Sequence, residues 1–209
     1  SVFASDSVVV PAAVGSDVNC GMRLHATDLD VGAFEAGRAS LVDKLRGDYL
    51  LGTRDIVLGA RSVRAMFDGG LPDWIDEVRS DPLGTLARTD LDAIAAESGR
   101  GFSEGALPGA SRWAPETLVS GEDPKRDDGL ATIGRGNHFV EVQVVDEIVD
   151  RHLAFAHGLR KGELAIMVHS GSRKVGKVVG SRWADRAREA WPAGARHPPS
   201  GIWPLSWSA

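Results

Sequence analysis

The chain has 209 residues, of which 43% are hydrophobic and 25% charged, with a formal net charge of −5. This balance predicts a buried core, and the negative charge excludes a general electrostatic attraction to nucleic acid or an anionic membrane. One cysteine excludes an internal disulfide, and the absence of any run of about 18 apolar residues argues against a membrane helix, so we expect a cytoplasmic protein.

The first half of the chain predicts one short strand and two helical regions. Three valines at 8–10 predict a strand that ends at the following proline. Asp17 and the single cysteine, Cys20, then lie in the loop beyond this strand. Apolar residues near helical spacing predict a helix over 31–50 and further helix within 71–97.

The second half combines an irregular segment with two strands. Residues 98–136 are rich in glycine, proline and charge, which is typical of a functional or mobile segment. Alternating apolar and polar residues predict a strand over 137–145. Residues 163–170 are apolar on both faces and therefore predict a central strand.

Residues 174–191 predict a helix with one apolar stripe. The stripe consists of Val175, Val178, Val179, Trp183, Ala187 and Trp191. Most other positions are charged and many are basic, which is typical of a solvated helix face, with a binding face as the alternative.

Four side chains that can bind metals lie at the ends of the predicted strands. Asp17 and Cys20 follow the first strand, His138 opens the second and His169 is near the end of the third. A carboxylate, a thiolate and two imidazoles form a ligand set for a divalent transition metal, and a thiolate can bridge two ions. We therefore predict one shared metal site.

Each of these residues also has an ordinary structural explanation. A free cysteine packs well in a core, and a lone histidine is usually structural. A cysteine protease built from Cys20, His138 and Asn137 would need its nucleophile on a helix. The alternation of the second strand instead sends His138 to one face and Asn137 with Glu141 to the other, so that one face can hold a metal and the other a ligand.

The segment HSGSRKVG links the third strand to the predicted helix. Backbone N–H groups at 171–173, with the side chains of Ser170, Ser172 and Arg173, predict a cradle for an anion such as phosphate. The same turn also fits a simple helix cap.

Three blocks of sequence resemble the RtcB family of RNA-splicing ligases. They are GSDVNCGMRL at 15–24, IGRGNHFVEVQ at 133–143 and MVHSGSRKVG at 167–176, in the order and spacing of that family. From the elements and this resemblance we expect an α+β fold, with mixed or antiparallel sheets forming a metal- and nucleotide-binding cleft and helices outside. We expect residues 1–209 to be a single partial catalytic domain.

The resemblance implies a GTP-dependent ligase that uses two manganese ions. Such an enzyme joins RNA ends bearing a 2′,3′-cyclic phosphate or 3′-phosphate to 5′-hydroxyl ends through a histidine–GMP intermediate. It implies that Asp17, Cys20 and His138 bind one manganese, and that Cys20 bridges to a second ion also bound by His169. It further implies a guanine-nucleotide site lined by Asn137, His138, Phe139, Val140 and Glu141, with Asn137 at the phosphate.

The chain departs from the family in its later histidines. The family's further metal-binding histidine and its guanylylated histidine lie well downstream of the HSGSR block. Here only His197 follows the predicted helix, in a context that matches neither, so no catalytic residue is assigned. We expect a chain that lacks the start and the C-terminal half of the domain and is inactive alone.

The expected partners are RNA, as tRNA halves or broken RNA, together with GTP and an archease-type activator. The segment 98–136 fits either a wall of the RNA path or a surface loop. Two other functions stay open: a non-catalytic remnant that binds metal, nucleotide or RNA, and a zinc-dependent phosphohydrolase that uses the same four ligands. The softness of a thiolate favours zinc over manganese.

Overall fold

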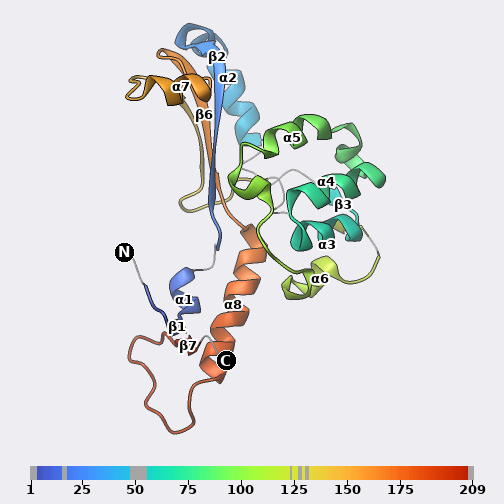
Figure 1. The fold of residues 1–209 in the computed structure, drawn as a ribbon, viewed down its shortest axis with the longest axis vertical. Helices are drawn as coiled ribbons and strands as arrows, with labels where there is room; N and C mark the ends of the chain where they lie inside the picture. Colours follow the sequence, from blue (N-terminus) through green and yellow to red (C-terminus); the bar gives the residue numbers. More distant parts are fainter. Residues whose placement is uncertain are drawn as a thin grey trace. The chain divides into compact units, whose positions relative to one another are not determined.

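The computed structural model describes residues 4–15, 18–47, 56–122, 124–126, 129 and 132–206. The chain divides into two compact units, and each contains helices and antiparallel strand pairs (Figure 1). Unit 1 is drawn from residues 1–18, 55–130 and 174–209, and unit 2 from 19–54 and 131–173. The predicted α+β class is therefore confirmed. Within the described ranges, every helix is too short or too polar to cross a membrane.

Unit 2 is built on a three-stranded antiparallel sheet. The strands are β2 (Gly21–Asp30), β6 (Glu163–Ser170) and β5 (Phe139–Val144), in the order β2-β6-β5. The central place of β6 was predicted from its apolar faces, and its Leu164 and Ala165 are buried. The strand β2 was not predicted, although it is the longest strand described.

Two helices accompany this sheet. The helix α2 (Val31–Leu45) begins where predicted, because the Asp30 side chain accepts a hydrogen bond from the Ala33 N–H at 2.8 Å. Residues 48–50 of the predicted helix lie outside the described residues. The helix α7 (Arg151–Ala156) joins β5 to β6, and Asp150 caps its first turn in the same way.

Unit 1 has a helical core. The helices α3 (Ala60–Asp68) and α4 (Leu71–Ser80) bury Val63, Ile75 and Val78 to between 1% and 3% exposure. The predicted helical region 71–97 is divided into two helices, since η2 (Gly84–Arg88) separates α4 from α5 (Leu91–Ser98).

In its described residues, the predicted irregular segment 98–136 contains only short elements. These are η3 (Phe102–Gly105), η4 (Ser111–Trp113), α6 (Glu116–Val119) and β4 (Lys125–Arg126), which pairs with β3 (Val57–Leu58).

The ends of the described chain pair with each other in unit 1. The predicted first strand is β1 (Val8–Val9), which pairs with β7 (Leu205–Ser206) and is followed by the short helix α1 (Pro11–Val14).

The predicted helix over 174–191 is α8 (Arg173–Glu189). Its buried residues are Gly176 and Ala187. Val178, which was predicted on the apolar stripe, is 40% exposed, so that part of the prediction is wrong.

Candidate metal centre

The topology of unit 2 brings three predicted ligands to one end of its sheet. Cys20 directly precedes β2, His138 directly precedes β5, and His169 is the second-last residue of β6. Because β2 and β5 both run antiparallel to β6, their first residues lie beside the last residues of β6. Segments that are distant in sequence thus meet at one point.

The distances among the three ligands suit a bound ion. Their donor atoms all lie within 4.8 Å of one another. The Cys20 Sγ is 3.6 Å from the His138 Nε2, and the two imidazole centroids are 5.5 Å apart. Donors around one tetrahedral ion lie roughly 3.3–3.8 Å apart, given typical metal–nitrogen and metal–sulfur bond lengths. The three side chains need only a small closure to share an ion.

The three candidate ligands differ in their exposure to solvent: His138 is buried, His169 is partly buried, and Cys20 is exposed. His138 is 9% exposed, and the His169 ring stacks on Phe139 with centroids 5.5 Å apart and planes at 22°. The His169 Nε2 is buried and has no hydrogen-bond partner among the described residues. Buried polar atoms are normally satisfied, so an orphaned nitrogen beside a thiol fits a metal ligand.

Cys20 is exposed, which contradicts the explanation that it is a small core hydrophobe. The turn that presents it contains Asn19, whose φ of 61° lies in the left-handed region that asparagine tolerates better than most residues. Two glycines flank the loop that holds Asp17 and Cys20. Gly15 has a φ of 84°, in the region that favours glycine, whereas Gly21 is an ordinary strand residue. Asp17, the fourth predicted ligand, lies outside the described residues.

The strand expected from Asn137 begins two residues later, at Phe139. Asn137 and His138 therefore precede the strand, and the predicted division of faces by alternation is wrong for them. Within β5, Phe139 pairs with His169. Glu141 lies on the same face of the strand, where its carboxylate accepts a hydrogen bond from the Gln143 amide at 2.8 Å.

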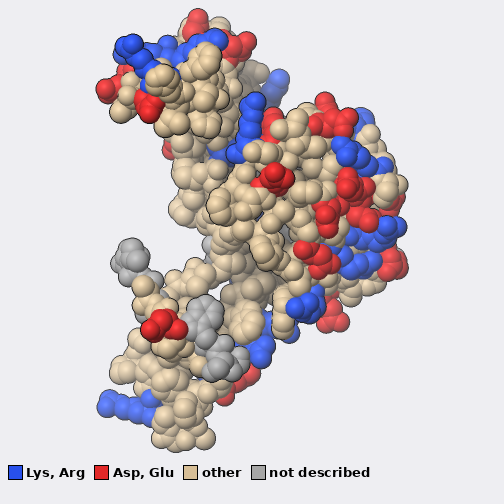
Figure 2. Space-filling model, in the orientation of Figure 1, with Lys and Arg blue, Asp and Glu red and all other residues tan. Residues whose placement is uncertain are grey.

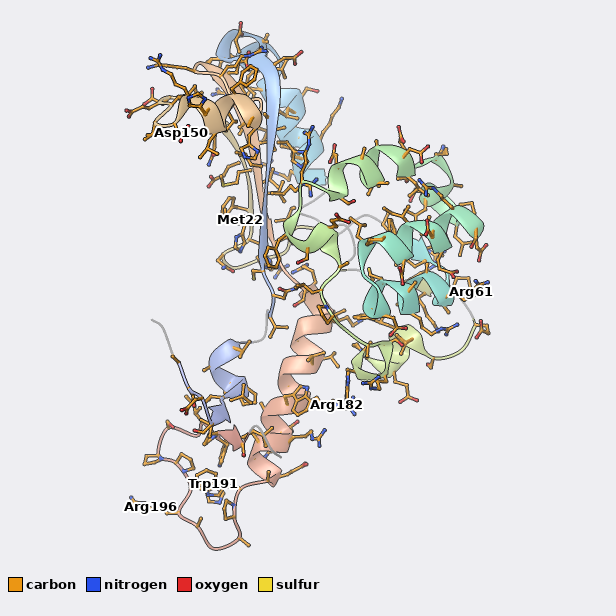
Figure 3. The ribbon with its side chains drawn as sticks, in the orientation of Figure 1. Met22, Arg61, Asp150, Arg182, Trp191 and Arg196 are labelled. Atoms are coloured by element: carbon orange, nitrogen blue, oxygen red, sulfur yellow. The ribbon has the colours of Figure 1, made fainter. Side chains whose placement is uncertain are left out.

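His169 also has a neighbour on its other side. Met22, which Figure 3 labels on β2, pairs with His169 and is 59% exposed. Sequence reasoning did not single out Met22, because no strand was expected there.

The predicted anion cradle is only partly available. The Ser170 hydroxyl donates to the Ile133 carbonyl at 2.8 Å and is thus already used. The Ser172 Oγ and the Arg173 Nε are buried without a hydrogen-bond partner in the described part of the chain. These two side chains can still donate to an anion.

One glycine allows Arg173 to approach the histidines. A Cβ at Gly134 would lie 2.5 Å from the His138 Nδ1 and closer still to the Arg173 guanidinium. Its φ of 108° is also one that side chains rarely adopt. Gly134 was not predicted as a site residue, although it lies inside the IGRGN block.

Comparisons with known proteins identify the family of this chain. The family model described as tRNA-splicing ligase RtcB matches residues 1–202. An RNA-splicing ligase RtcB homolog 1 from Entamoeba dispar is 33% identical over 183 residues, which cover 87% of this chain and 32% of the relative.

Two archaeal relatives give the same result. The tRNA-splicing ligase RtcB of Thermococcus kodakarensis is 32% identical over 184 residues, covering 85% of this chain and 34% of the relative. That of Aeropyrum pernix is 30% identical over 184 residues, covering 84% and 34%. The chain thus spans about a third of the length of these relatives. It belongs to the RtcB family of tRNA-splicing ligases.

Proposed function

We propose that this chain contributes the metal-binding part of an RNA ligase active site. The observation that carries the proposal is the convergence of Cys20, His138 and His169 at one end of the unit 2 sheet. The proposed reaction joins RNA ends bearing a 2′,3′-cyclic phosphate or 3′-phosphate to 5′-hydroxyl ends. The names of the relatives favour tRNA halves as substrate, with broken RNA as the alternative.

The proposed cofactors are two manganese ions. Asp17, Cys20 and His138 would hold the first, and Cys20 and His169 the second. Bound divalent ions neutralise and align phosphoryl groups as they are transferred. The thiolate and imidazole donors alone favour zinc, so the identity of the metal needs measurement.

The proposed guanine-nucleotide site is the segment 137–141, with Asn137 at the phosphate. The stacking of Phe139 on His169 supports this, because it puts the segment directly beside the ligands. Arg173 and Ser172 supply further donors, since a guanidinium can bind phosphate oxygens through two parallel hydrogen bonds. In this arrangement Arg173 holds the phosphate, while the histidines and the thiol hold the ions.

The guanylylated histidine is not assigned to any residue of this chain. We propose that the chain is a partial catalytic domain, and that the histidine–GMP step needs residues from the rest of the ligase. Labelled GTP should therefore leave no covalent guanylate on the 209-residue chain. An archease-type activator stays a prediction of the family resemblance, and a cytoplasmic location stays a prediction from the single cysteine and the lack of a long apolar run.

Calorimetric titration with manganese, and separately with zinc, tests the metal site. Cys20→Ala and His169→Ala should each weaken binding by at least the ~10–100-fold that loss of even an outer-shell partner costs. His25→Ala is the matched control, because His25 lies on β2 but pairs with Ile166, on the opposite face from His169. Unchanged affinity in both ligand variants would contradict the proposal.

A zinc-dependent phosphohydrolase is the second candidate, because one thiolate with two imidazoles is a common zinc set. Stoichiometric zinc in protein purified without added metal, together with phosphatase activity lost in Cys20→Ala, would favour it. A non-catalytic remnant is a third outcome. It would be supported if Cys20→Ala in a full-length ligase background left RNA joining unchanged.

A further inference from the structure

The helix α8 presents a basic face that the metal centre does not use. We define the basic face of α8 as Lys174, Lys177, Ser181, Arg182 and Arg186, which recur near helical spacing. On the other side of the helix, Gly176 and Ala187 are buried. Burial of that side fixes the orientation of the helix, so the basic side chains are held toward solvent.

The excess of positive charge on α8 lies in residues 173–182, which contain no acidic residue. Asp185 and Glu189 come later and line the same side of the helix as the basic residues, and Asp185 pairs with Arg188 at 3.0 Å. Lys177 and Arg182 are exposed, and the described residues offer them no ion-pair partner. Figure 3 labels Arg182 on α8. A shallow depression runs along this side of the helix, between Lys174 and Glu189.

Other helices of unit 1 do not share this pattern. In Figure 2 the surface of α3, α4 and α5 shows acidic and basic side chains interleaved. Arg61 there pairs with Glu77 at 3.0 Å, and Arg79 lies 3.4 Å from Asp76. Charges paired in this way attract a polyanion weakly, whereas Lys177 and Arg182 of α8 have no ion-pair partner among the described residues.

The Trp183 ring positions one of the arginines of the basic face. The Arg186 guanidinium lies over the Trp183 ring, 4.8 Å from its centroid, and Trp183 in turn is 6.4 Å from Trp113. Stacking on the ring holds the arginine in place at the far end of the basic face. The face therefore combines two lysines with one guanidinium that is positioned by an aromatic ring.

Sequence proximity links the basic face to the candidate metal centre. Lys174 follows His169 by five residues, so the two cannot be more than about 18 Å apart however the chain runs. From Lys174 to Arg186 the helix rises about 18 Å, the length of about five stacked nucleotides of one strand.

We propose that the basic face of α8 binds the phosphate backbone of single-stranded RNA close to the end that is joined. This inference rests on the proposed function, which supplies the RNA end, and it adds the surface that holds the strand. RNA is favoured over an acidic protein because the face is regular along a straight helix and starts within reach of the phosphate-handling residues.

Fluorescence anisotropy with a short labelled RNA bearing a 3′-phosphate tests the proposal. The double variant Lys177→Glu/Arg182→Glu should raise the Kd about tenfold or more, and should flatten the salt dependence by about 1.4 in log–log slope for two lost phosphate contacts. The control Arg88→Glu/Arg100→Glu makes the same charge change at exposed sites of unit 1 outside α8, and should change both quantities much less.

Three results would overturn the proposal. The first is equal weakening by both double variants, which would make the effect one of net charge. The second is competition by an acidic peptide as strong as that by RNA, which would assign the face to protein partners. The third is unchanged binding in Lys177→Ala/Arg182→Ala, a milder pair that serves if the charge reversal prevents folding.

A metal titration separates this inference from the proposed function. If the proposed function is right and this inference is wrong, Cys20→Ala will weaken metal binding, whereas Lys177→Glu/Arg182→Glu will leave RNA binding unchanged. If the inference is right and the function wrong, RNA binding will depend on Lys177 and Arg182 in a chain that binds no metal.

Discussion

The core of unit 1 and the sheet of unit 2 are packed very differently. In unit 1, α3 and α4 enclose Val63, Ile75 and Val78 almost completely. In unit 2, neither β2 nor α2 has a buried residue, and Met22 and Leu24 are 59% and 45% exposed. The proposed metal ligands lie in the unit whose β2 and α2 are exposed. We therefore expect stability and metal binding to depend on different parts of the chain, and four measurements can break or sharpen this contrast.

The largest effect is expected in the unit 1 core. Ile75→Ala removes three buried carbons at a site that is 3% exposed, and should lower the free energy of unfolding by about 2–5 kcal/mol. Chemical denaturation measures the loss. Under conditions where the variant stays folded, metal affinity should remain close to that of the unaltered chain. A matching collapse of metal binding would show that the two units do not act separately.

Metal binding should stabilise unit 2. An ion at about 100 times its Kd adds ~2.7 kcal/mol to the free energy of unfolding if it binds only the folded chain. Thermal melts with and without manganese or zinc measure the gain, and a chelator should reverse it. His169→Ala should abolish the gain, whereas His25→Ala should keep it. A gain that persists in His169→Ala would place the ion elsewhere.

The close approach at Gly134 offers a test within the site. Gly134→Ala puts a methyl group against the His138 ring and the Arg173 guanidinium, at a φ that favours glycine. We expect a loss of about 1–3 kcal/mol, typical of overpacking, together with weaker metal binding because His138 is displaced. Gly136→Ala is the control, since it too has a positive φ but open space around it. Equal effects of both changes would show that the loss comes from backbone strain and not from contact with His138 and Arg173.

The smallest effect is expected at the start of α2. Asp30→Ala removes the side chain that caps the helix and should cost about 1 kcal/mol of stability. Asp30→Asn should recover most of it, because an asparagine also caps well. Denaturation midpoints of the two variants measure the difference. If the cap mattered to the metal centre, the alanine variant would also bind metal more weakly, which we do not expect.

Elements marked by an apolar run or by apolar residues at helical spacing were predicted correctly. The apolar run of β6, the helical spacing of α8 and the helical region around α4 and α5 could all be read directly from the sequence. The start of α2 was predicted from apolar residues near helical spacing, and the Asp30 cap holds the helix start at that place.

Elements that depend on distant partners were missed. The strand β2 consists largely of exposed residues and forms because it pairs with β6, far along the chain. The approach of Gly134 to Arg173 and the turn at Asn19 have no periodic signal. The meeting of Cys20, His138 and His169 was inferred from motifs at strand ends. Their common edge follows from an antiparallel strand order that spacing alone does not reveal.

Strand register has a consequence for how the site is assembled. Phe139 and Met22 lie beside His169 only in one alignment of the three strands, and a slip of one residue would turn each of them to the opposite side. The pairing of β2 with β6 joins residues that are far apart in the sequence, and such long loops close slowly during folding. Cys20 and the two histidines therefore come together only when β6 has paired with both of its neighbours, so that correct strand pairing and assembly of the candidate metal centre coincide.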